Sequence, residues 1–240
     1  MNTQLYLIRK TKALFIRFQL HRVFEPFSGL LLNLAYLSKI SKWAHENRSI
    51  AFNDFYSGTW DYNKRFKLYE HLHKNEGLSE SVTYLEFGVS QGHSFKWWAA
   101  NNKNIDSRFF GFDTFEGLPE DWGVFKAGAM STNSALPDIN DSRVAFVKGL
   151  FQDTFPPFLK NNDLSNRLVI HLDADLYSST LYVLTSIAPY LKSGDVLIFD
   201  EFSVPKHEFL AYTNFIQSYY LKFELIAAAN NYFFTAFKLK

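Results

Sequence analysis

Acidic side chains at regular positions are the most informative feature of this sequence. Asp173 and Asp175 follow one short apolar run, and Asp200 with Glu201 follows the next such run along the chain. Carboxylates gathered in one place suit a hard cation such as Mg²⁺, Mn²⁺ or Ca²⁺, or act as general bases. The plainer alternative is that Asp173 and Asp175 cap the helix that follows them, while Glu201 forms an ion pair at the surface.

A second group of residues has the pattern of a nucleotide-binding turn. The segment 86–94 reads EFGVSQGHS and joins an apolar run to a helical stretch. Gly88 and Gly92 would let the backbone approach a ligand, and the helix start offers free N–H groups. The spacing differs from the dinucleotide G-x-G-x-x-G fingerprint, so a simple tight turn also explains the two glycines.

Asp113 extends this pattern, because it ends the next apolar run along the chain. An acid at this point can accept hydrogen bonds from both hydroxyls of an adenosine ribose. Capping of the loop that follows is the alternative role. Together with the glycine turn, Asp113 favours an adenosine-type cofactor.

The elements that must position these residues alternate between strands and helices from residue 82 onward. We predict strands at 83–87, 108–112, 144–148, 168–172 and 196–199, and helices at 93–101, 152–160, 178–191 and 206–221. This alternation indicates an α/β fold with a parallel sheet and helices on both faces. Two final β-type runs, 223–229 and 232–238, predict an antiparallel hairpin around Asn230-Asn231. Ligands of such sheets bind at the carboxyl ends of the strands, where the acids described above lie.

The first 60 residues have a different character. We predict helices at 4–24 and 29–45, broken around Pro26 and Gly29, and a third helix at 62–75. Residues 1–50 carry eight Lys/Arg and two Glu. No apolar run reaches the roughly 18 residues of a membrane span, and charged residues interrupt any secretory signal.

We therefore divide the chain into an N-terminal helical extension or cap, 1–60, and a catalytic domain, 61–240. The basic extension either packs on that domain or lies on an anionic surface, as a peripheral membrane contact or a contact to a lipid-linked substrate. We expect a cytoplasmic protein. Nucleic acid is an improbable partner, because the basic residues cluster outside the catalytic part without a recognition motif. The absence of cysteine excludes disulfides and iron–sulfur clusters.

Five segments spanning roughly 83–203 resemble the macrocin O-methyltransferase family, which methylates sugar hydroxyls in macrolide and aminocoumarin antibiotic biosynthesis. They read YLEFGVSQGHS, FFGFDTFEGLPEDW, VKGLFQDTFP, HLDADLYSST and GDVLIFDEF. The resemblance implies a Rossmann-like class I methyltransferase fold, with a seven-stranded sheet whose last strand is antiparallel. It also implies S-adenosylmethionine and Mg²⁺ as cofactors, a sugar hydroxyl as the acceptor, and a homo-oligomer. Residues 1–60 carry no comparable motif.

The resemblance also assigns site residues. It implies that the cofactor is bound by Glu86, Gly88, Gly92, Ser94, Asp113 and Gln152. It implies that Mg²⁺ is bound by Asp173, Asp200 and Glu201, and that Asp175 is the general base. One departure from the family concerns Glu201, because the family usually has Asp there and the extra methylene moves the carboxylate outward.

The sequence thus predicts a Mg²⁺-dependent O-methyltransferase that transfers a methyl group from S-adenosylmethionine to a hydroxyl. Two alternatives stay open at this stage. A D-x-D pair also binds nucleotide-sugar diphosphates through a cation, as in a metal-dependent glycosyltransferase. The fold could also be a binding protein without catalytic activity.

Overall fold

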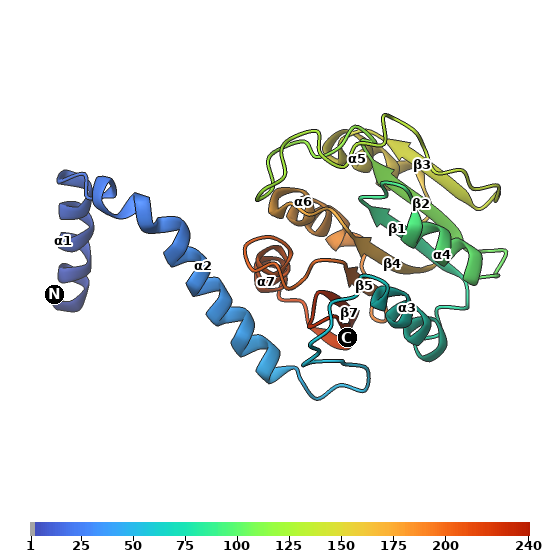
Figure 1. Ribbon diagram of the computed structural model, residues 1–240, viewed down its shortest axis with the longest axis horizontal. Helices are drawn as coiled ribbons and strands as arrows, with labels where there is room; N and C mark the ends of the chain where they lie inside the picture. Colours follow the sequence, from blue (N-terminus) through green and yellow to red (C-terminus); the bar gives the residue numbers. More distant parts are fainter. Residues whose placement is uncertain (1–2) are drawn as a thin grey trace.

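A computed structural model describes residues 3–240, so Met1 and Asn2 of the predicted extension lie outside the described residues. The helices are α1 (Thr3–Arg17), α2 (His21–Glu46), α3 (Lys64–Asn75), α4 (His93–Asn101), α5 (Phe151–Asn161), α6 (Tyr177–Ile187), the short 3₁₀ helix η1 (Ala188–Tyr190) and α7 (Glu208–Tyr219). The strands are β1 (Val82–Phe87), β2 (Arg108–Asp113), β3 (Val144–Lys148), β4 (Arg167–Leu172), β5 (Val196–Phe199), β6 (Phe223–Ala229) and β7 (Phe234–Leu239). Figure 1 shows a layered domain with a helical segment extending from it.

The seven strands form one sheet in the order β3-β2-β1-β4-β5-β7-β6. The pairs among β1 to β5 are parallel, and β7 runs antiparallel to both β5 and β6. The order reverses direction between β1 and β4, and ligands of open α/β sheets bind at such a reversal. The predicted α/β fold, with its parallel sheet and terminal antiparallel hairpin, is confirmed.

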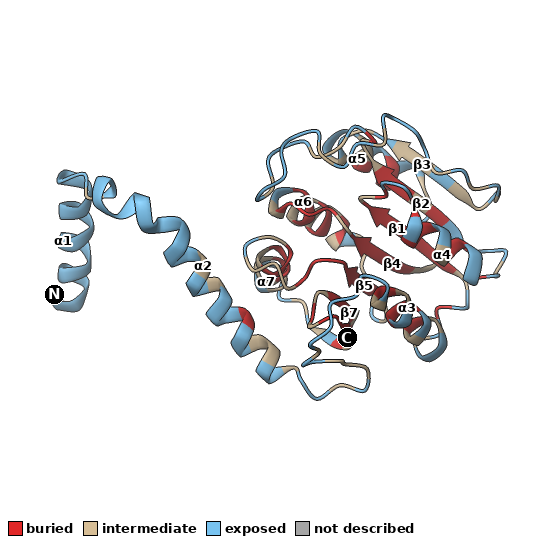
Figure 2. Ribbon diagram, viewed as in Figure 1, coloured by how far each residue is buried: buried red, intermediate tan, exposed pale blue. Residues whose placement is uncertain are grey.

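Apolar side chains cover both faces of this sheet. The helices α5, α6 and α7 pack on one face together with the end of α2, and α3 and α4 pack on the other face. Central strands such as β4 are therefore buried on both sides, which explains their continuous apolar sequence. Figure 2 shows this buried centre within the domain and a mostly exposed N-terminal segment.

The strand and helix predictions from residue 62 onward agree with the structure to within a few residues. The hairpin turn also lies where predicted, and Asn230, Asn231 and Tyr232 all have left-handed backbone conformations there. Asparagine tolerates this conformation better than most residues, which explains its place in the turn.

The N-terminal prediction was wrong in one respect. The break between the first two helices lies at residues 18–20, where Gln19 has a φ of 50°, and α2 then continues through Pro26 and Gly29. One proline near the start of a long helix removes a single hydrogen bond, and the remaining turns maintain the helix. No helix among residues 3–240 is both long and apolar enough to cross a membrane.

Residues 3–39, which we call the arm, extend away from the domain (Figure 1). Within α2 only the C-terminal end packs on the core, through Ile40, Trp43 and Ala44. The Trp43 ring lies 4.8 Å from that of Phe202, centroid to centroid, and Phe202 directly follows Glu201. The arm is therefore not a cap over the domain, although its base is attached behind the tip of β5.

Candidate active site

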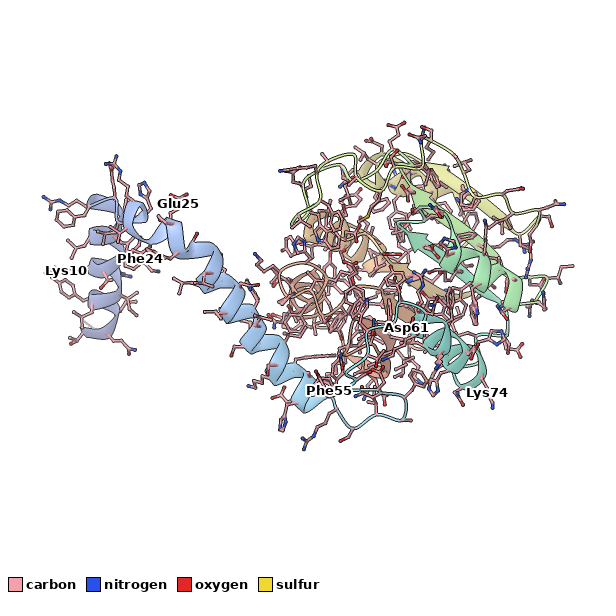
Figure 3. The ribbon with its side chains drawn as sticks, in the orientation of Figure 1. Lys10, Phe24, Glu25, Phe55, Asp61 and Lys74 are labelled. Carbon is pink, nitrogen blue, oxygen red and sulfur yellow. The ribbon has the colours of Figure 1, made fainter. Side chains whose placement is uncertain are left out.

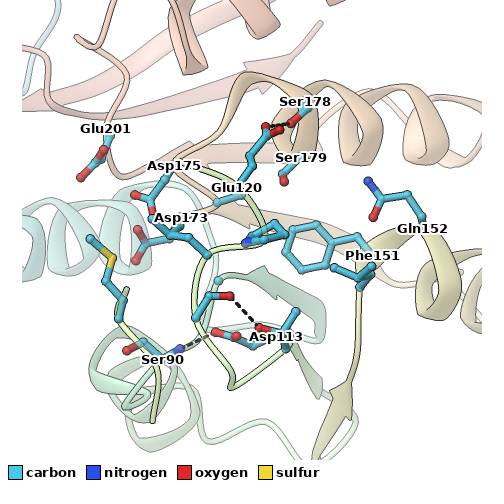
Figure 4. A pocket seen from close by; sticks show the side chains of 18 of the residues that line it. Ser90, Asp113, Glu120, Phe151, Gln152, Asp173, Asp175, Ser178, Ser179 and Glu201 are labelled. Atoms are coloured by element: carbon cyan, nitrogen blue, oxygen red, sulfur yellow. Dashed lines mark hydrogen bonds between the residues drawn. The ribbon is translucent and has the colours of Figure 1, made fainter. Parts of the chain in front are cut away.

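A cavity of about 500 Å³ opens at the carboxyl ends of β1, β2 and β4 (Figure 4). This volume lies within the roughly 300–1,000 Å³ of small-molecule sites. Six of the ten predicted site residues line it, namely Gly88, Asp113, Gln152, Asp173, Asp175 and Glu201. Their individual roles stay predictions, but the structure brings them to one place.

The loop after β1 forms the floor of the cavity. Gly88 has a φ of +94°, and a Cβ atom there would lie 1.8 Å from the backbone oxygen of Asp173. The Asp173 N–H in turn donates to the Phe87 carbonyl at 2.9 Å. Glycine at position 88 is therefore required for the loops after β1 and β4 to lie against each other, which places Asp113 and Asp173 in one cavity.

Asp113 is held in place by backbone groups. Its two carboxylate oxygens accept hydrogen bonds from the N–H groups of Ser90 and Phe115, both at 2.7 Å. The loop-capping role is thus real. A carboxylate offers about four lone-pair positions, so Asp113 can still accept hydrogen bonds from a ligand. Figure 4 shows its side chain beside Ser90 at the cavity wall.

Three residues predicted to bind the cofactor do not line the cavity. Glu86 is buried and accepts a hydrogen bond from the Tyr84 hydroxyl. Ser94 is buried too, with its hydroxyl oxygen 3.1 Å from that of Tyr69. Gly92 faces the loop at Pro137, since a Cβ atom would lie 2.8 Å from that ring. The side chains of Glu86 and Ser94 therefore point into the protein, and the cofactor role predicted for all three residues stays a prediction.

The tip of β4 presents Asp173 and Asp175 to the cavity (Figure 4). The strand ends at Leu172, and Asp175 adopts a left-handed backbone conformation with a φ of 57°. Such a conformation costs of order 1–3 kcal/mol for a residue other than glycine and is often found at functional sites. His171 does not line the cavity with these two acids. It lies beneath the cavity among buried charged side chains, which we call the buried layer and which consists of Arg65, Glu86, His171 and Asp200.

Asp200 belongs to that buried layer. One of its carboxylate oxygens accepts from the Tyr62 hydroxyl at 3.1 Å and from Arg65 Nη1 at 3.3 Å. The other accepts from the Tyr69 hydroxyl at 3.2 Å and lies 3.2 Å from His171 Nε2. Although burial opposes its charge, hydrogen bonding to His171 and the charges of His171 and Arg65 lower the pKa of Asp200. Four donors therefore occupy this carboxylate.

His171 is charged in this arrangement. Burial disfavours the charged ring, but hydrogen bonds to Asp200 and Glu86 raise the pKa of His171 to about 9. The buried layer thus contains two cations, His171 and Arg65, opposite two carboxylates, Glu86 and Asp200. These four charges compensate one another beneath the cavity.

The acids that face the cavity lack such compensation. Burial, with the charges of Asp200 and Asp175, raises the pKa of Asp173 well above its ordinary value. Burial and the charge of Asp200 likewise raise the pKa of Asp175 to about 7, even though a hydrogen bond from Glu201 acts in the opposite direction. Burial and the charge of Asp175 raise the pKa of Glu201 to about 9. At neutral pH, Glu201 therefore carries the proton of the hydrogen-bonded pair that it forms with Asp175.

The predicted metal ligands Asp173, Asp200 and Glu201 do not form a common ligand set. Across residues 3–240, no three His, Asp or Glu side chains are arranged to hold a metal ion. The physical reason lies in Asp200, whose oxygens are already occupied by the donors of the buried layer. Glu201 Oε2 is buried without a hydrogen-bond partner, but one such atom does not make a cation site.

Sequence reasoning missed several residues of this site. Tyr62 lines the cavity, and the Arg65 guanidinium lies 4.2 Å from the centre of its ring. Glu120 closes one side by accepting a hydrogen bond from the Ser178 hydroxyl at 2.7 Å. Ser90 and Glu120 fall inside the quoted motifs and could have been found there. Tyr62 and Arg65 lie outside every motif, and nothing in the sequence links them to Asp200.

Comparison with known proteins identifies the central part of the chain. Residues 85–202 match the profile of a family described as "Methyltransferase domain". A curated relative, demethyldecarbamoylnovobiocin O-methyltransferase of Streptomyces niveus, is 31% identical over 108 residues. These residues cover 38% of this chain and 40% of the relative, so the chain matches well under half of that protein's length.

Two solved structures share the fold. The calicheamicin methyltransferase CalS11 has a TM-score of 0.57 at 23% identity, covering 74% of this chain and 78% of that chain. The O-methyltransferase NovP has a TM-score of 0.57 at 20% identity, covering 73% of this chain and 79% of that chain. The family match and these folds agree with the resemblance that the sequence motifs indicated.

Proposed function

Because residues 85–202 belong to the methyltransferase domain family, we propose that the chain is an O-methyltransferase that methylates a sugar hydroxyl with S-adenosylmethionine. One observation carries the proposal. The acid at the tip of β2, Asp113, and the acids at the tip of β4, Asp173 and Asp175, line the same cavity. The site thus has one group for the ribose of a cofactor and separate groups for an acceptor.

The cofactor part of the cavity suits an adenosyl group. Asp113 keeps free lone pairs for the ribose hydroxyls, and its carboxylate is already fixed by two backbone N–H groups. Leu150 and Phe151 give this side apolar surface for a purine ring, with Gln152 beside them at the start of α5. Bound here, S-adenosylmethionine would supply an electrophilic methyl group on a sulfonium.

Asp175 is the proposed general base. With S-adenosylmethionine bound, its methyl group would pass to the acceptor oxygen and its sulfur would leave as a neutral thioether, so the Asp175 carboxylate is the group that would accept the hydroxyl proton. A pKa of about 7 leaves Asp175 ionised above neutral pH and makes it a stronger base than an ordinary aspartate. The proton held by Glu201 keeps the neighbouring charge low. Asp173, beside Asp175, is placed to orient the acceptor hydroxyl.

The sugar acceptor is inferred from the relatives. One relative is described as a demethyldecarbamoylnovobiocin O-methyltransferase, and a second CalS11 structure is described as a TDP-rhamnose 3′-O-methyltransferase. The remaining cavity wall offers polar groups that can bind hydroxyls, namely Tyr62, Glu120, Ser178 and Ser179. A polar acceptor with several hydroxyls fits this wall better than an apolar one.

The Mg²⁺ dependence that the resemblance implies stays a prediction. The side chains as they stand do not fit the implied ligand set, because Asp200 is occupied by Tyr62, Arg65, Tyr69 and His171. We therefore assign no step to a metal. Acceptor activation in this proposal depends on Asp175 alone.

Ligand binding tests the proposal against the glycosyltransferase alternative. We expect S-adenosylhomocysteine to bind with a calorimetric signal and to raise the melting temperature, and uridine diphosphate with Mg²⁺ to do neither. Asp113→Asn should weaken S-adenosylhomocysteine binding by about tenfold or more, because charge-assisted hydrogen bonds are roughly twice as strong as neutral ones. Asp163→Asn is the matched control, since Asp163 is an exposed acid whose carboxylate accepts hydrogen bonds from Ser165. Tight binding of the diphosphate, or unchanged binding by Asp113→Asn, would reject the assignment.

A further inference from the structure

The arm, residues 3–39, exposes an unusual amount of apolar surface. Of the 28 large hydrophobic side chains exposed among residues 3–240, sixteen lie between Leu5 and Leu37. Figure 3 shows the arm with its side chains around both helices, with Lys10 on α1 and Glu25 on α2 labelled. Soluble monomers rarely expose continuous apolar patches of this extent, so the arm requires a binding partner.

The first helix of the arm is amphipathic. Residues three and four apart share a face of a helix, which places a group of apolar residues along one side of α1. This side consists of Leu7, Ile8, Leu14 and Phe15. The four basic residues of α1 lie around the rest of its circumference, namely Arg9, Lys10, Lys12 and Arg17. The apolar Leu5, Tyr6 and Ile16 are interspersed with them. A basic amphipathic helix of this type suits the interface between water and an anionic membrane.

The second helix continues the apolar surface. Residues 26–38 of α2 contain no charged side chain. One face carries Val23, Phe27, Leu30, Leu34 and Leu37 at alternating spacings of four and three residues, and all five are exposed. Ile40 and Trp43 lie on another side of the helix, where they attach its end to the domain. The catalytic domain therefore leaves the apolar face between Val23 and Leu37 uncovered.

The charge of the arm distinguishes between two possible partners of this surface, a second arm and an anionic lipid membrane. The arm contains six Lys/Arg and a single acid, Glu25. Pairing of two arms would bring two strongly basic segments together, and like charges repel. Anionic lipid headgroups instead attract each Lys or Arg near the surface. The catalytic domain itself has an excess of acids, which keeps it away from the same membrane.

We propose that the arm binds an anionic lipid surface, with the apolar faces of α1 and α2 inserted at the level of the headgroups. Trp43 and Tyr232 then hold the domain at the membrane, because the Trp43 ring packs against that of Tyr232 and the Tyr232 hydroxyl donates to the Ala44 carbonyl at 3.2 Å.

Vesicle flotation with the full chain tests the proposal. We expect binding to vesicles of phosphatidylcholine with phosphatidylglycerol, weaker binding at high salt, and little binding to phosphatidylcholine alone. Leu30→Glu/Leu34→Glu should reduce partitioning at least about 100-fold, because each buried Leu side chain contributes roughly tenfold or more. Lys10→Gln/Lys12→Gln should reduce it about 25-fold, at roughly fivefold for each basic residue.

The control is Ile105→Glu/Val124→Glu, which places two acids at similarly exposed aliphatic positions of the catalytic domain. It should bind vesicles like the wild type, and all variants should keep the melting temperature of the domain. Light scattering without lipid tests the alternative, in which the arms of two chains pair with each other. A defined dimer that Leu30→Glu/Leu34→Glu converts to a monomer, without vesicle binding by the wild type, would overturn the proposal. Equal binding to both kinds of vesicle would overturn it as well.

Discussion

The two sides of the catalytic cavity are built on different physical principles. On the cofactor side, the one acid, Asp113, is fixed by backbone N–H groups at 2.7 Å. On the acceptor side, Asp173, Asp175 and Glu201 are crowded together with raised pKa values, and Glu201 Oε2 has no hydrogen-bond partner. One side is electrostatically satisfied before any ligand binds, and the other is not.

The two sides therefore serve different purposes, one binding a ligand and the other accepting a proton. A cofactor site gains affinity from preorganised hydrogen bonds, which is what the backbone around Asp113 provides. A base needs a proton affinity matched to the working pH, and crowding of acids in a buried place produces that. The buried cations, Arg65 and His171, limit the crowding by holding Asp200 out of the cavity.

Among the substitutions on the acceptor side, we expect Asp175→Asn to lower kcat the most. The amide keeps the shape of the side chain but cannot accept the hydroxyl proton, so we expect kcat to fall about 10²–10⁴-fold. Binding of S-adenosylhomocysteine, measured by calorimetry, should stay within about threefold of the wild type, because Asp113 and its loop are untouched.

Asp173→Ala, measured in the same assays, tests whether Asp173 binds a metal that activates the acceptor. If Asp173 bound a metal that activates the acceptor, its removal would cost more than the loss of the base. The structure, in which Asp200 is occupied by four donors, leads us to expect the reverse order. A greater loss from Asp173→Ala, together with inactivation by a chelator that excess Mg²⁺ reverses, would restore the metal prediction.

Arg65→Met should show that the buried layer supports the acceptor side. Removing one partner of a buried ion pair typically costs 3–5 kcal/mol, and the exposed edge of Arg65 places this case near the lower figure. We expect the free energy of unfolding in urea to fall by about 3 kcal/mol. The double variant Arg65→Met/Asp200→Asn should recover much of this loss, since no uncompensated charge stays buried. Independent, additive effects of the two substitutions would contradict the coupling.

The same contrast explains what could be predicted from the sequence. Apolar periodicity fixed β1 to β5, and residues within short motifs gave Gly88, Asp113, Asp173 and Asp175, because local chain geometry determines their positions. The buried surroundings of Asp200 could not be predicted, for a different reason. Its environment depends on Tyr62 and Arg65, which lie about 135–138 residues earlier in the chain. No local pattern records such a pairing.

The arm shows the same limit on a larger scale. Its periodicity predicts helices with apolar faces, and both helices are present. Periodicity cannot say what covers such a face, so the sequence left open both a cap packed on the domain and a helix on an anionic surface. The decisive feature was exposure, which only the structure provides.

Activity should depend on pH through the acceptor side, although the effect is smaller than that of the substitutions above. Asp175 has a raised pKa of about 7 and must be ionised to accept a proton. Activity should therefore fall about tenfold for each pH unit below 7 and level off above it. Binding of S-adenosylhomocysteine, measured at the same pH values, separates this effect from a loss of cofactor affinity. A flat kcat/KM profile between pH 5.5 and 7 would remove Asp175 as the base.

Glu201→Gln should have the smallest effect and defines the role of the second acid in the pair. Glu201 carries a proton below its raised pKa of about 9, so a neutral amide that also donates to Asp175 reproduces its state at pH 7.5. We expect kcat to stay within about fivefold of the wild type there, against a loss of about 100-fold or more for Asp175→Asn. Above pH 9 the two proteins should diverge, because Glu201 ionises only in the wild type and its charge then repels that of Asp175. A loss from Glu201→Gln as large as that from Asp175→Asn at pH 7.5 would mean that Glu201 acts as a carboxylate, and the acceptor side would then need a cation after all.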